Sequence, residues 1–146
     1  MKKKSMKLLI KKLDSQAKLP QYAHPGDAGL DIFCNEEYIL KPGERYLFTT
    51  GIQIAIPEGC VGLIWDKSGL AVNYGLKTMA GVIDEGYRGE LKILLLNLNN
   101  KEYLVEKYSK IAQLIIQKKE IVEIEEANNL NSTKRGEDGF GSTGLK

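Results

Sequence analysis

Residues 36–65 read EEYILKPGERYLFTTGIQIAIPEGCVGLIW, and they show most plainly how this chain is built. The stretch contains four short apolar runs, at 36–40, 45–50, 51–56 and 60–65. A Pro-Gly sequence separates the first two runs and a Pro-Glu-Gly sequence separates the last two, and both are typical of turns. Because the runs are this short and rich in Tyr, Ile, Leu, Val and Thr, they predict β-strands.

The same pattern continues on both sides of this stretch. It predicts further strands at 6–13, 30–34, 91–99, 102–108, 111–117 and 120–126. No segment sustains a capped amphipathic helix over three turns, and the most helix-like piece, SGLAVNYGL at 68–76, is interrupted by two glycines. The sequence therefore predicts one all-β domain, a sandwich, jelly roll or barrel.

The apolar pattern stops after residue 126. We expect a body at 1–126, a polar linker ANNLNSTK at 127–134, and a glycine-rich C-terminal arm at 135–146. Ordering such an arm costs roughly 1–2 kcal/mol per residue. Within RGEDGFGSTG, residues 135–144, Phe140 is the only large apolar side chain. We therefore expect the arm to be mobile when empty and to become ordered only when it closes over a ligand.

Composition limits the class of function. Beyond the first twelve residues acidic side chains outnumber basic ones, which argues against a nucleic-acid scaffold. The apolar run near the start is too short for a signal peptide, and no run approaches a membrane span. Cys34 and Cys60 lack metal-site spacing, so we expect reduced thiols in a cytoplasmic protein. His24 is the only histidine and lies in a loop, which argues against Ser-His or Cys-His catalysis. The first twelve residues contain no acid and six lysines, which we expect to form a solvated end and the exposed face of a first strand, namely Lys2, Lys3, Lys4, Lys7, Lys11 and Lys12.

Two segments of the body carry unusual polar groups. In AGLDIF (28–33), Asp31 lies between Leu30 and Ile32, so strict alternation places it on the opposite face, either towards solvent or near a bound cation. In WDKSGLA (65–71), Lys67, Ser68 and Gly69 follow a predicted strand. A cation, a hydroxyl and exposed amides at such a junction can bind an anion, although the segment is not a P-loop.

Two later segments also depart from simple strands. In GVIDEGYRGEL (81–91), an apolar strand runs into Asp84, and we expect a β-hairpin with Asp84 and Tyr87 at its mouth. Such a carboxylate can orient a water and accept its proton, or it can simply cap the turn. In KIAQLII (110–116), Gln113 interrupts an apolar strand and needs a hydrogen-bond partner, such as a phosphate oxygen or a bound water.

Together with RGEDGFGSTG, these four segments resemble the five motifs of trimeric dUTP pyrophosphatases, the dUTPases, in order and spacing over about residues 24–144. The resemblance implies a distorted jelly-roll barrel that assembles as a homotrimer with active sites shared between subunits. It implies Mg²⁺-dependent hydrolysis of dUTP to dUMP and pyrophosphate, which limits uracil in DNA and supplies dUMP for dTTP synthesis.

The resemblance also implies roles for individual residues. Asp84 would activate the water that attacks the α-phosphorus, Tyr87 would lie under the deoxyribose, and Asp31 would act on the metal through water. The base would be read by the strand around Thr78, Gly81, Val82 and Ile83, with Phe140 stacked over uracil. The phosphates would be bound by Lys67, Ser68, Gly69, Gln113, Arg135, Ser142, Thr143 and Gly144.

Two departures from the family pattern concern charge. The second motif usually reads Pro-Arg-Ser, whereas this chain has Asp66, Lys67 and Ser68, so the bidentate guanidinium is lost. In the fourth motif Lys110 stands where arginine is common.

Two other functions remain open. A dCTP deaminase or bifunctional enzyme resembles a pattern with glutamate at the position of Arg88, and a non-catalytic regulatory β-trimer would not need Asp84.

Overall fold

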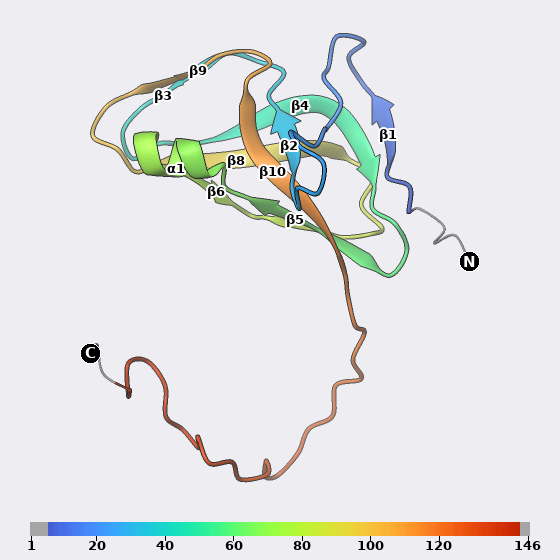
Figure 1. Ribbon diagram of the computed structural model, residues 1–146, viewed down its shortest axis with the longest axis vertical. Helices are drawn as coiled ribbons and strands as arrows, with labels where there is room; N and C mark the ends of the chain where they lie inside the picture. Colours follow the sequence, from blue (N-terminus) through green and yellow to red (C-terminus); the bar gives the residue numbers. More distant parts are fainter. Residues whose placement is uncertain (1–5, 144–146) are drawn as a thin grey trace.

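The computed structural model describes residues 6–143, so Lys2, Lys3, Lys4 and Gly144 lie outside the described residues. Within them the chain forms ten strands and one short helix (Figure 1). In chain order these are β1 (Leu9–Lys12), β2 (Leu30–Phe33), β3 (Tyr38–Leu40), β4 (Arg45–Ala55), β5 (Cys60–Trp65), α1 (Ser68–Tyr74), β6 (Leu76–Met79), β7 (Val82–Ile83), β8 (Glu90–Asn97), β9 (Tyr103–Val105) and β10 (Lys110–Lys118).

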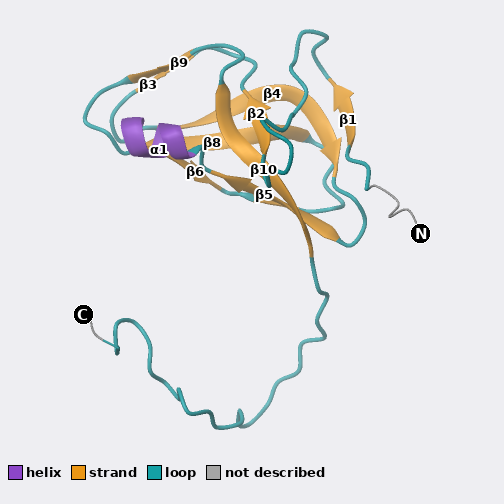
Figure 2. Ribbon diagram, viewed as in Figure 1, coloured by secondary structure: helices purple, strands orange, loops and turns teal. Residues whose placement is uncertain are grey.

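The strands form two four-stranded antiparallel sheets and a separate ribbon (Figure 2). One sheet has the order β1-β4-β8-β6, the other β2-β10-β5-β7, and the ribbon pairs β3 with β9. Side chains of both sheets fill one core, including Phe48 and Ile93 from the first sheet and Ile32 and Leu114 from the second. The prediction of an all-β, jelly-roll-like body is therefore confirmed.

The runs at 45–50 and 51–56 form one strand, β4, rather than the two that we expected. Gly51 has a φ of +70°, and the register of β4 on β8 shifts between Thr49 and Gln53. This is the geometry of a bulge, which bends a strand without ending it. Past the bulge β4 pairs with β1, so one long strand links β8 to the N-terminal strand.

The expected hairpin at 81–91 is wrong. β7 pairs with β5, through Gly62 and Ile83, whereas β8 pairs with β4 and β6. The turn between β7 and β8 therefore passes from one sheet to the other. Adjacent strands in a sequence pattern do not reveal this, because their pairing depends on partners elsewhere in the chain.

A helix forms where the sequence predicted none. α1 lies at Ser68–Tyr74 and ends at Gly75, whose φ of +65° is left-handed and whose N–H donates to the carbonyls of Ala71 and Leu70. Glycine at this position is a helix C-cap. One of the two glycines that we took as interruptions therefore ends the helix instead of preventing it.

The expected strand at 120–126 is also absent from the described chain. β10 ends at Lys118 and is already paired on both sides, with β2 and β5. The chain then leaves the body as an extended tail (Figure 1). Ile121, Val122 and Ile124 are at least three-quarters exposed, so an apolar, strand-like segment has no partner within residues 6–143.

Other expectations are confirmed where the structure describes the residues. Lys7, Lys11 and Lys12 are exposed, and Cys34 and Cys60 are buried free thiols. His24 belongs to a turn in which its N–H donates to Asp27 Oδ2 at 2.9 Å. Among residues 6–143, no helix is long and apolar enough to cross a membrane.

Candidate functional site

Asp84 and Tyr87 meet at a hollow of about 270 Å³. Asp84 follows β7 directly, and the Tyr87 N–H donates to the Asp84 carbonyl at 3.1 Å, which closes a tight turn. Both side chains are exposed. The structure thus brings together the predicted base and the predicted sugar-binding aromatic. The hollow is lined by Leu47, Ala80, Val82, Ile83, Asp84, Tyr87, Glu90, Lys92 and Leu94.

The Tyr87 ring is held in place by its own turn. Its hydroxyl donates to the Glu90 carbonyl at 2.9 Å, and Arg88 Nη1 donates to the carbonyls of Glu85 and Tyr87 at 2.7 and 2.8 Å. A Cβ on Gly89 would lie 2.3 Å from the Tyr87 hydroxyl oxygen. Gly89 is therefore required for the ring to lie where it does, a signal that the sequence reading missed.

The base-reading set divides into two parts. Val82 and Ile83 line the hollow, as does Ala80, which the sequence reading did not single out. Thr78 is buried, and both its N–H and its hydroxyl donate to Asp66. The Gly81 carbonyl accepts the Ile64 N–H at 2.8 Å, and a Cβ on Gly81 would lie 2.6 Å from the Ile64 carbonyl oxygen. The donors of Thr78 are thus occupied within the chain.

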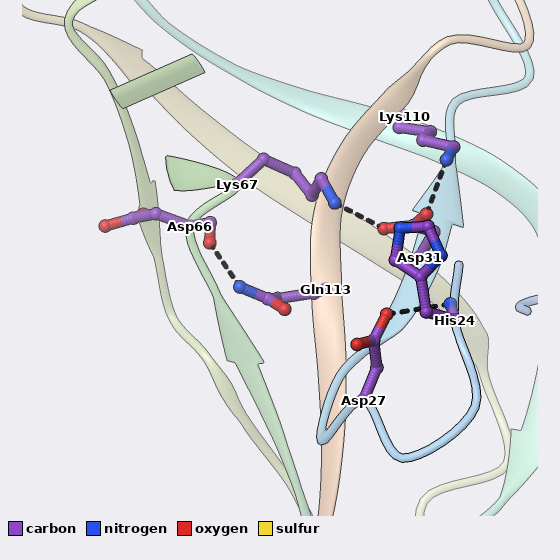
Figure 3. Close-up of polar contacts among 7 residues, drawn as sticks. All are labelled: His24, Asp27, Asp31, Asp66, Lys67, Lys110 and Gln113. Carbon is purple, nitrogen blue, oxygen red and sulfur yellow. Dashed lines mark hydrogen bonds and ion pairs between the residues drawn. The ribbon is translucent and has the colours of Figure 1, made fainter. Parts of the chain in front are cut away.

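Asp31, Lys67 and Lys110 form an ionic cluster in which a buried carboxylate meets two partly exposed lysines (Figure 3). Asp31 is 2% exposed and faces the interior, so the solvent-facing alternative is wrong. Lys67 Nζ lies 2.5 Å from its Oδ1, and Lys110 Nζ lies 2.7 Å from its Oδ2. Burial raises the pKa of Asp31, but the hydrogen bonds from Lys110 and Lys67 outweigh it, so the pKa lies below its ordinary value. Asp31 is therefore an ionised carboxylate between two cations.

Gln113 connects this cluster to the turn that precedes α1. It pairs with Asp31 on β2 and with Trp65 on β5, so the three residues form a row across the sheet. Its Nε2 donates to the Asp66 carbonyl at 2.8 Å (Figure 3), and a Cβ on Gly29 would lie 2.2 Å from its Oε1. Gln113 thus has a backbone carbonyl as a partner, whereas we expected a phosphate oxygen or a bound water. The first, second and fourth motifs meet at this end of the sheet.

Asp84 and the Asp31 cluster lie at opposite ends of β5. Gly62 pairs with Ile83, which places Asp84 next to the start of β5, whereas Trp65, Lys67 and Ser68 lie at its end. Four residues of extended strand separate these ends by about 13 Å. One protomer therefore presents two partial sites, and neither contains both the predicted base and the predicted phosphate-binding turn.

The arm adds a third group of residues. Phe140 is fully exposed and has a φ of +50°. Arg135 Nε donates to the Asp138 carbonyl at 2.9 Å, and the Ser142 N–H donates to the Gly139 carbonyl at 3.1 Å. Arg135, Phe140, Ser142 and Thr143 line one hollow formed by the arm itself. Within residues 6–143 the hydrogen bonds of 133–142 are all local, so the arm stands away from the body.

A magnesium ion would find few ligands in a single chain. Within the described residues, no three His, Cys, Asp or Glu side chains come close enough to hold a metal ion. Mg²⁺ usually keeps several waters and takes one or two carboxylates together with substrate phosphates. Asp31 is a buried, ionised carboxylate, but both of its oxygens are paired with lysines, so it fits that pattern only through the water shell of an ion whose direct ligands are phosphates.

Comparisons with known proteins cover nearly the whole chain. The model of the dUTPase family matches residues 15–144. The chain is 50% identical to the deoxyuridine 5'-triphosphate nucleotidohydrolase of Clostridium kluyveri over 141 residues, which is 95% of this chain and 99% of that protein. It is 47% identical to that of Hydrogenobaculum sp. over 144 residues, 97% of this chain and 100% of that protein.

Solved structures are similar over the whole body. A variant of the dUTPase of Staphylococcus bacteriophage 80alpha with dUpNHpp has a TM-score of 0.86 and 31% identity, covering 97% of this chain and 100% of that chain. A variant of the dUTPase of phage phi11 of S. aureus, whose structure shows the coordination of a structural Mg(II) ion, has a TM-score of 0.81 and 28% identity, covering 87% of this chain and 100% of that chain.

Proposed function

The chain belongs to the dUTPase family, and on that premise we propose how its residues hydrolyse dUTP to dUMP and pyrophosphate. The observation that carries the proposal is the convergence of Asp84 and Tyr87 on one hollow. Asp84 accepts a proton from a water whose oxygen bonds to the α-phosphorus. The bond from that phosphorus to the oxygen bridging the α- and β-phosphates breaks, and pyrophosphate leaves with that oxygen. The reaction limits uracil in DNA and supplies dUMP for dTTP synthesis.

The hollow also provides a basis for recognising the nucleoside. Tyr87 is fixed by its hydrogen bond to the Glu90 carbonyl, so its ring can support the deoxyribose without moving. Val82 and Ile83 line the hollow and belong to β7, an edge strand of its sheet, so backbone groups on its unpaired edge can read the uracil edge. Phe140 is free of the body and supplies an aromatic face for the base. Stacking of this kind contributes roughly 1–3 kcal/mol per base.

Phosphate binding is assigned to the other end of β5 and to the arm. Lys67 carries positive charge, and Ser68 and Gly69 begin α1 in exposed positions. Gln113 donates one Nε2 hydrogen to the Asp66 carbonyl, so the other can be donated to a phosphate oxygen. Arg135, Ser142 and Thr143 add charge and hydroxyls when the arm closes. Mg²⁺ bound to the phosphates would neutralise developing charge. Asp31 would hold the ion through its water shell.

We further propose that the enzyme is a homotrimer with shared sites. The hollow around Asp84 is smaller than the 300–1,000 Å³ or so of typical ligand pockets, and the phosphate-binding turn lies about 13 Å from Asp84 along β5. A second copy that brings its Lys67 end to the Asp84 hollow would complete the site. The exposed apolar residues Ile121, Val122 and Ile124 support such an assembly, because contact with another chain would bury them.

The nucleotide substrate and the two free thiols favour the cytoplasm as the place of action. No contact of the described residues favours a deaminase. Arg88, at the position where that pattern has glutamate, is committed to bracing the turn through the carbonyls of Glu85 and Tyr87. Incubation with dUTP and with dCTP, reading pyrophosphate, uracil and ammonia separately, distinguishes a dUTPase, a deaminase and an inactive trimer.

The proposed base is tested by Asp84→Asn. The variant should bind the nucleotide with nearly parental affinity, but its turnover should fall by roughly 10²–10⁴, the usual contribution of a general base. A matched control is Glu85→Gln, which alters the neighbouring carboxylate. Glu85 binds the Gly59 N–H at 2.8 Å and Lys119 at 3.1 Å, and its variant should keep parental turnover. Hydrolysis by Asp84→Asn within a few-fold of the parent would exclude Asp84 as the base.

A further inference from the structure

Asp66 joins three elements of the site through a single side chain and its carbonyl. Its Oδ1 accepts both the N–H and the hydroxyl of Thr78, each at 2.6 Å, and its Oδ2 accepts Lys77 Nζ at 2.9 Å. Its backbone carbonyl accepts Gln113 Nε2 at 2.8 Å. The Asp66 side chain is 23% exposed. Burial raises its pKa, but the bonds from Lys77 and Thr78 outweigh this, so the pKa is lowered and the group is ionised.

The bonds to Thr78 fix one end of the segment that faces the base. Thr78 lies near the end of β6, and the chain reaches the hollow two residues later, at Ala80. The other end is fixed where the Ile64 N–H donates to the Gly81 carbonyl and where β7 pairs with β5. Between them Ala80 adopts a φ of +54°, a conformation that costs a non-glycine residue free energy and persists only when its surroundings impose it.

We propose that Asp66 is a positioning residue for base selection. It fixes the position of residues 78–83, and these determine how much room the hollow beside Asp84 leaves for the pyrimidine base. The inference rests on the proposed dUTPase function, and it assigns Asp66 no contact with the nucleotide. Thr78 acts through the same hydrogen bonds, because its N–H and hydroxyl are bound to Asp66 rather than directed at the base. With residues 78–83 held in this way, the site favours a pyrimidine without a 5-methyl group over one that carries it.

The two halves of the network can be separated experimentally. Thr78 is buried and its bonds go to an ionised acceptor, which makes them about twice as strong as neutral ones. Lys77 is about half exposed, so its ion pair is screened by solvent and contributes little. Asparagine at position 66 keeps an acceptor oxygen for Thr78 and loses the charge, whereas alanine loses both.

The test compares Asp66→Ala, Asp66→Asn and Lys77→Met in the full-length protein. The measured quantities are kcat and KM for dUTP, dTTP and dCTP, together with the melting temperature and the oligomeric state. A hydrophobic slot discriminates one methyl group by roughly 10–200-fold, so Asp66→Ala should lower the dUTP:dTTP ratio of kcat/KM by about tenfold or more. KM for dUTP should rise more than kcat falls. Asp66→Asn should restore most of the ratio, and Lys77→Met should leave it at the parental value.

A parental dUTP:dTTP ratio in Asp66→Ala would overturn the inference, as would equal losses in Asp66→Ala and Lys77→Met. If Asp66→Ala does not assemble, the partner residue decides. Thr78→Val removes the hydroxyl bond and Thr78→Ser keeps it, so the ratio should fall in the first and remain in the second. A parental ratio in Thr78→Val would then overturn the inference. Absence of dUTP hydrolysis by the parent protein would instead refute the proposed function.

Discussion

If Asp84 and the arm of one site come from different copies, two inactive proteins should rescue each other. One protein carries Asp84→Asn with its arm intact, and the other keeps Asp84 but ends after Asn131. Each homotrimer then lacks either the base or the pair Arg135 and Phe140. The truncated chain still contains the exposed apolar segment through which we expect the copies to assemble, namely Ile121, Val122, Ile124 and Leu130.

The size of the rescue follows from threefold symmetry. Each copy gives its Asp84 to one site and its arm to another, so a trimer with both kinds of chain has one site with base and arm intact. Verified mixed trimers should therefore show about one third of parental turnover per trimer. The truncated parent loses a charge-assisted bond of about 1.5–3 kcal/mol and stacking of roughly 1–3 kcal/mol, and hence about hundredfold or more in activity. The expected rescue stands well above that background.

The assay is release of pyrophosphate from dUTP by co-expressed chains that carry two different tags. Mixed trimers are purified over both tags in succession, and their composition is verified by native mass spectrometry. Parental chains with the same two tags provide the control and should have full activity. If verified mixed trimers are as inactive as the two homotrimers, the arm serves the Asp84 of its own chain. That result is geometrically possible, because the tail begins close to Asp84. Its first residue is Lys119, whose Nζ lies 3.1 Å from Oε2 of Glu85, the residue after Asp84.

Two further substitutions test the ionic cluster. Lys67→Arg should keep or lower KM for dUTP, because a planar guanidinium can bind a phosphate through two parallel hydrogen bonds; a large rise in a steady-state comparison would show that the site is shaped around lysine. Asp31→Asn should lower the free energy of unfolding at pH 7 by about 1–3 kcal/mol, since bonds to charged groups contribute about 1.5–3 kcal/mol each and part is offset by relief of desolvation. Because the pKa of Asp31 is lowered in the folded protein, its stabilisation is present above the ordinary value of 3.8 and is lost as pH falls through the folded pKa. Urea unfolding at matched protein concentration should therefore show a difference in the free energy of unfolding between parent and variant that becomes smaller below about pH 4. A difference that does not depend on pH would contradict the role of the carboxylate charge.

Most of the strands were predictable because a local pattern of short apolar runs and turn residues marks them, although β4 was expected as two strands and β6 was not expected from the pattern. Their pairing was not, as β7 and β8 show: the turn at 84–89 looks like a hairpin, but its two strands belong to different sheets. The segment at 120–126 has a strand pattern and no strand partner in the described chain. In both cases the local signal is real, and long-range partners determine the outcome.

The site shows the same division. Asp84 and Tyr87 were found from one contiguous motif, because a single turn holds them both. The partners of Asp31 come from residues 36 and 79 positions further along, which no local reading supplies. Asp66 was visible only as a replacement for proline, and its bonds to Thr78 depend on the return of β6 to that point. Residues that act through contacts between distant segments are therefore the ones that a single sequence conceals.

If the arm closes over a nucleotide, its local turns reduce the entropic cost of that closure. The Gly136 N–H donates to Thr133 Oγ1, the Asp138 N–H to the Arg135 carbonyl, and the Ser142 N–H to the Gly139 carbonyl, each spanning three residues. Freezing ten unrestrained residues would cost on the order of 10–20 kcal/mol, which stacking and a few phosphate bonds barely match. A segment already folded into successive turns has fewer conformations to lose, so preorganisation shifts part of that entropic cost from the binding step to the free protein. Closure then resembles the docking of a small preformed unit on a flexible tether.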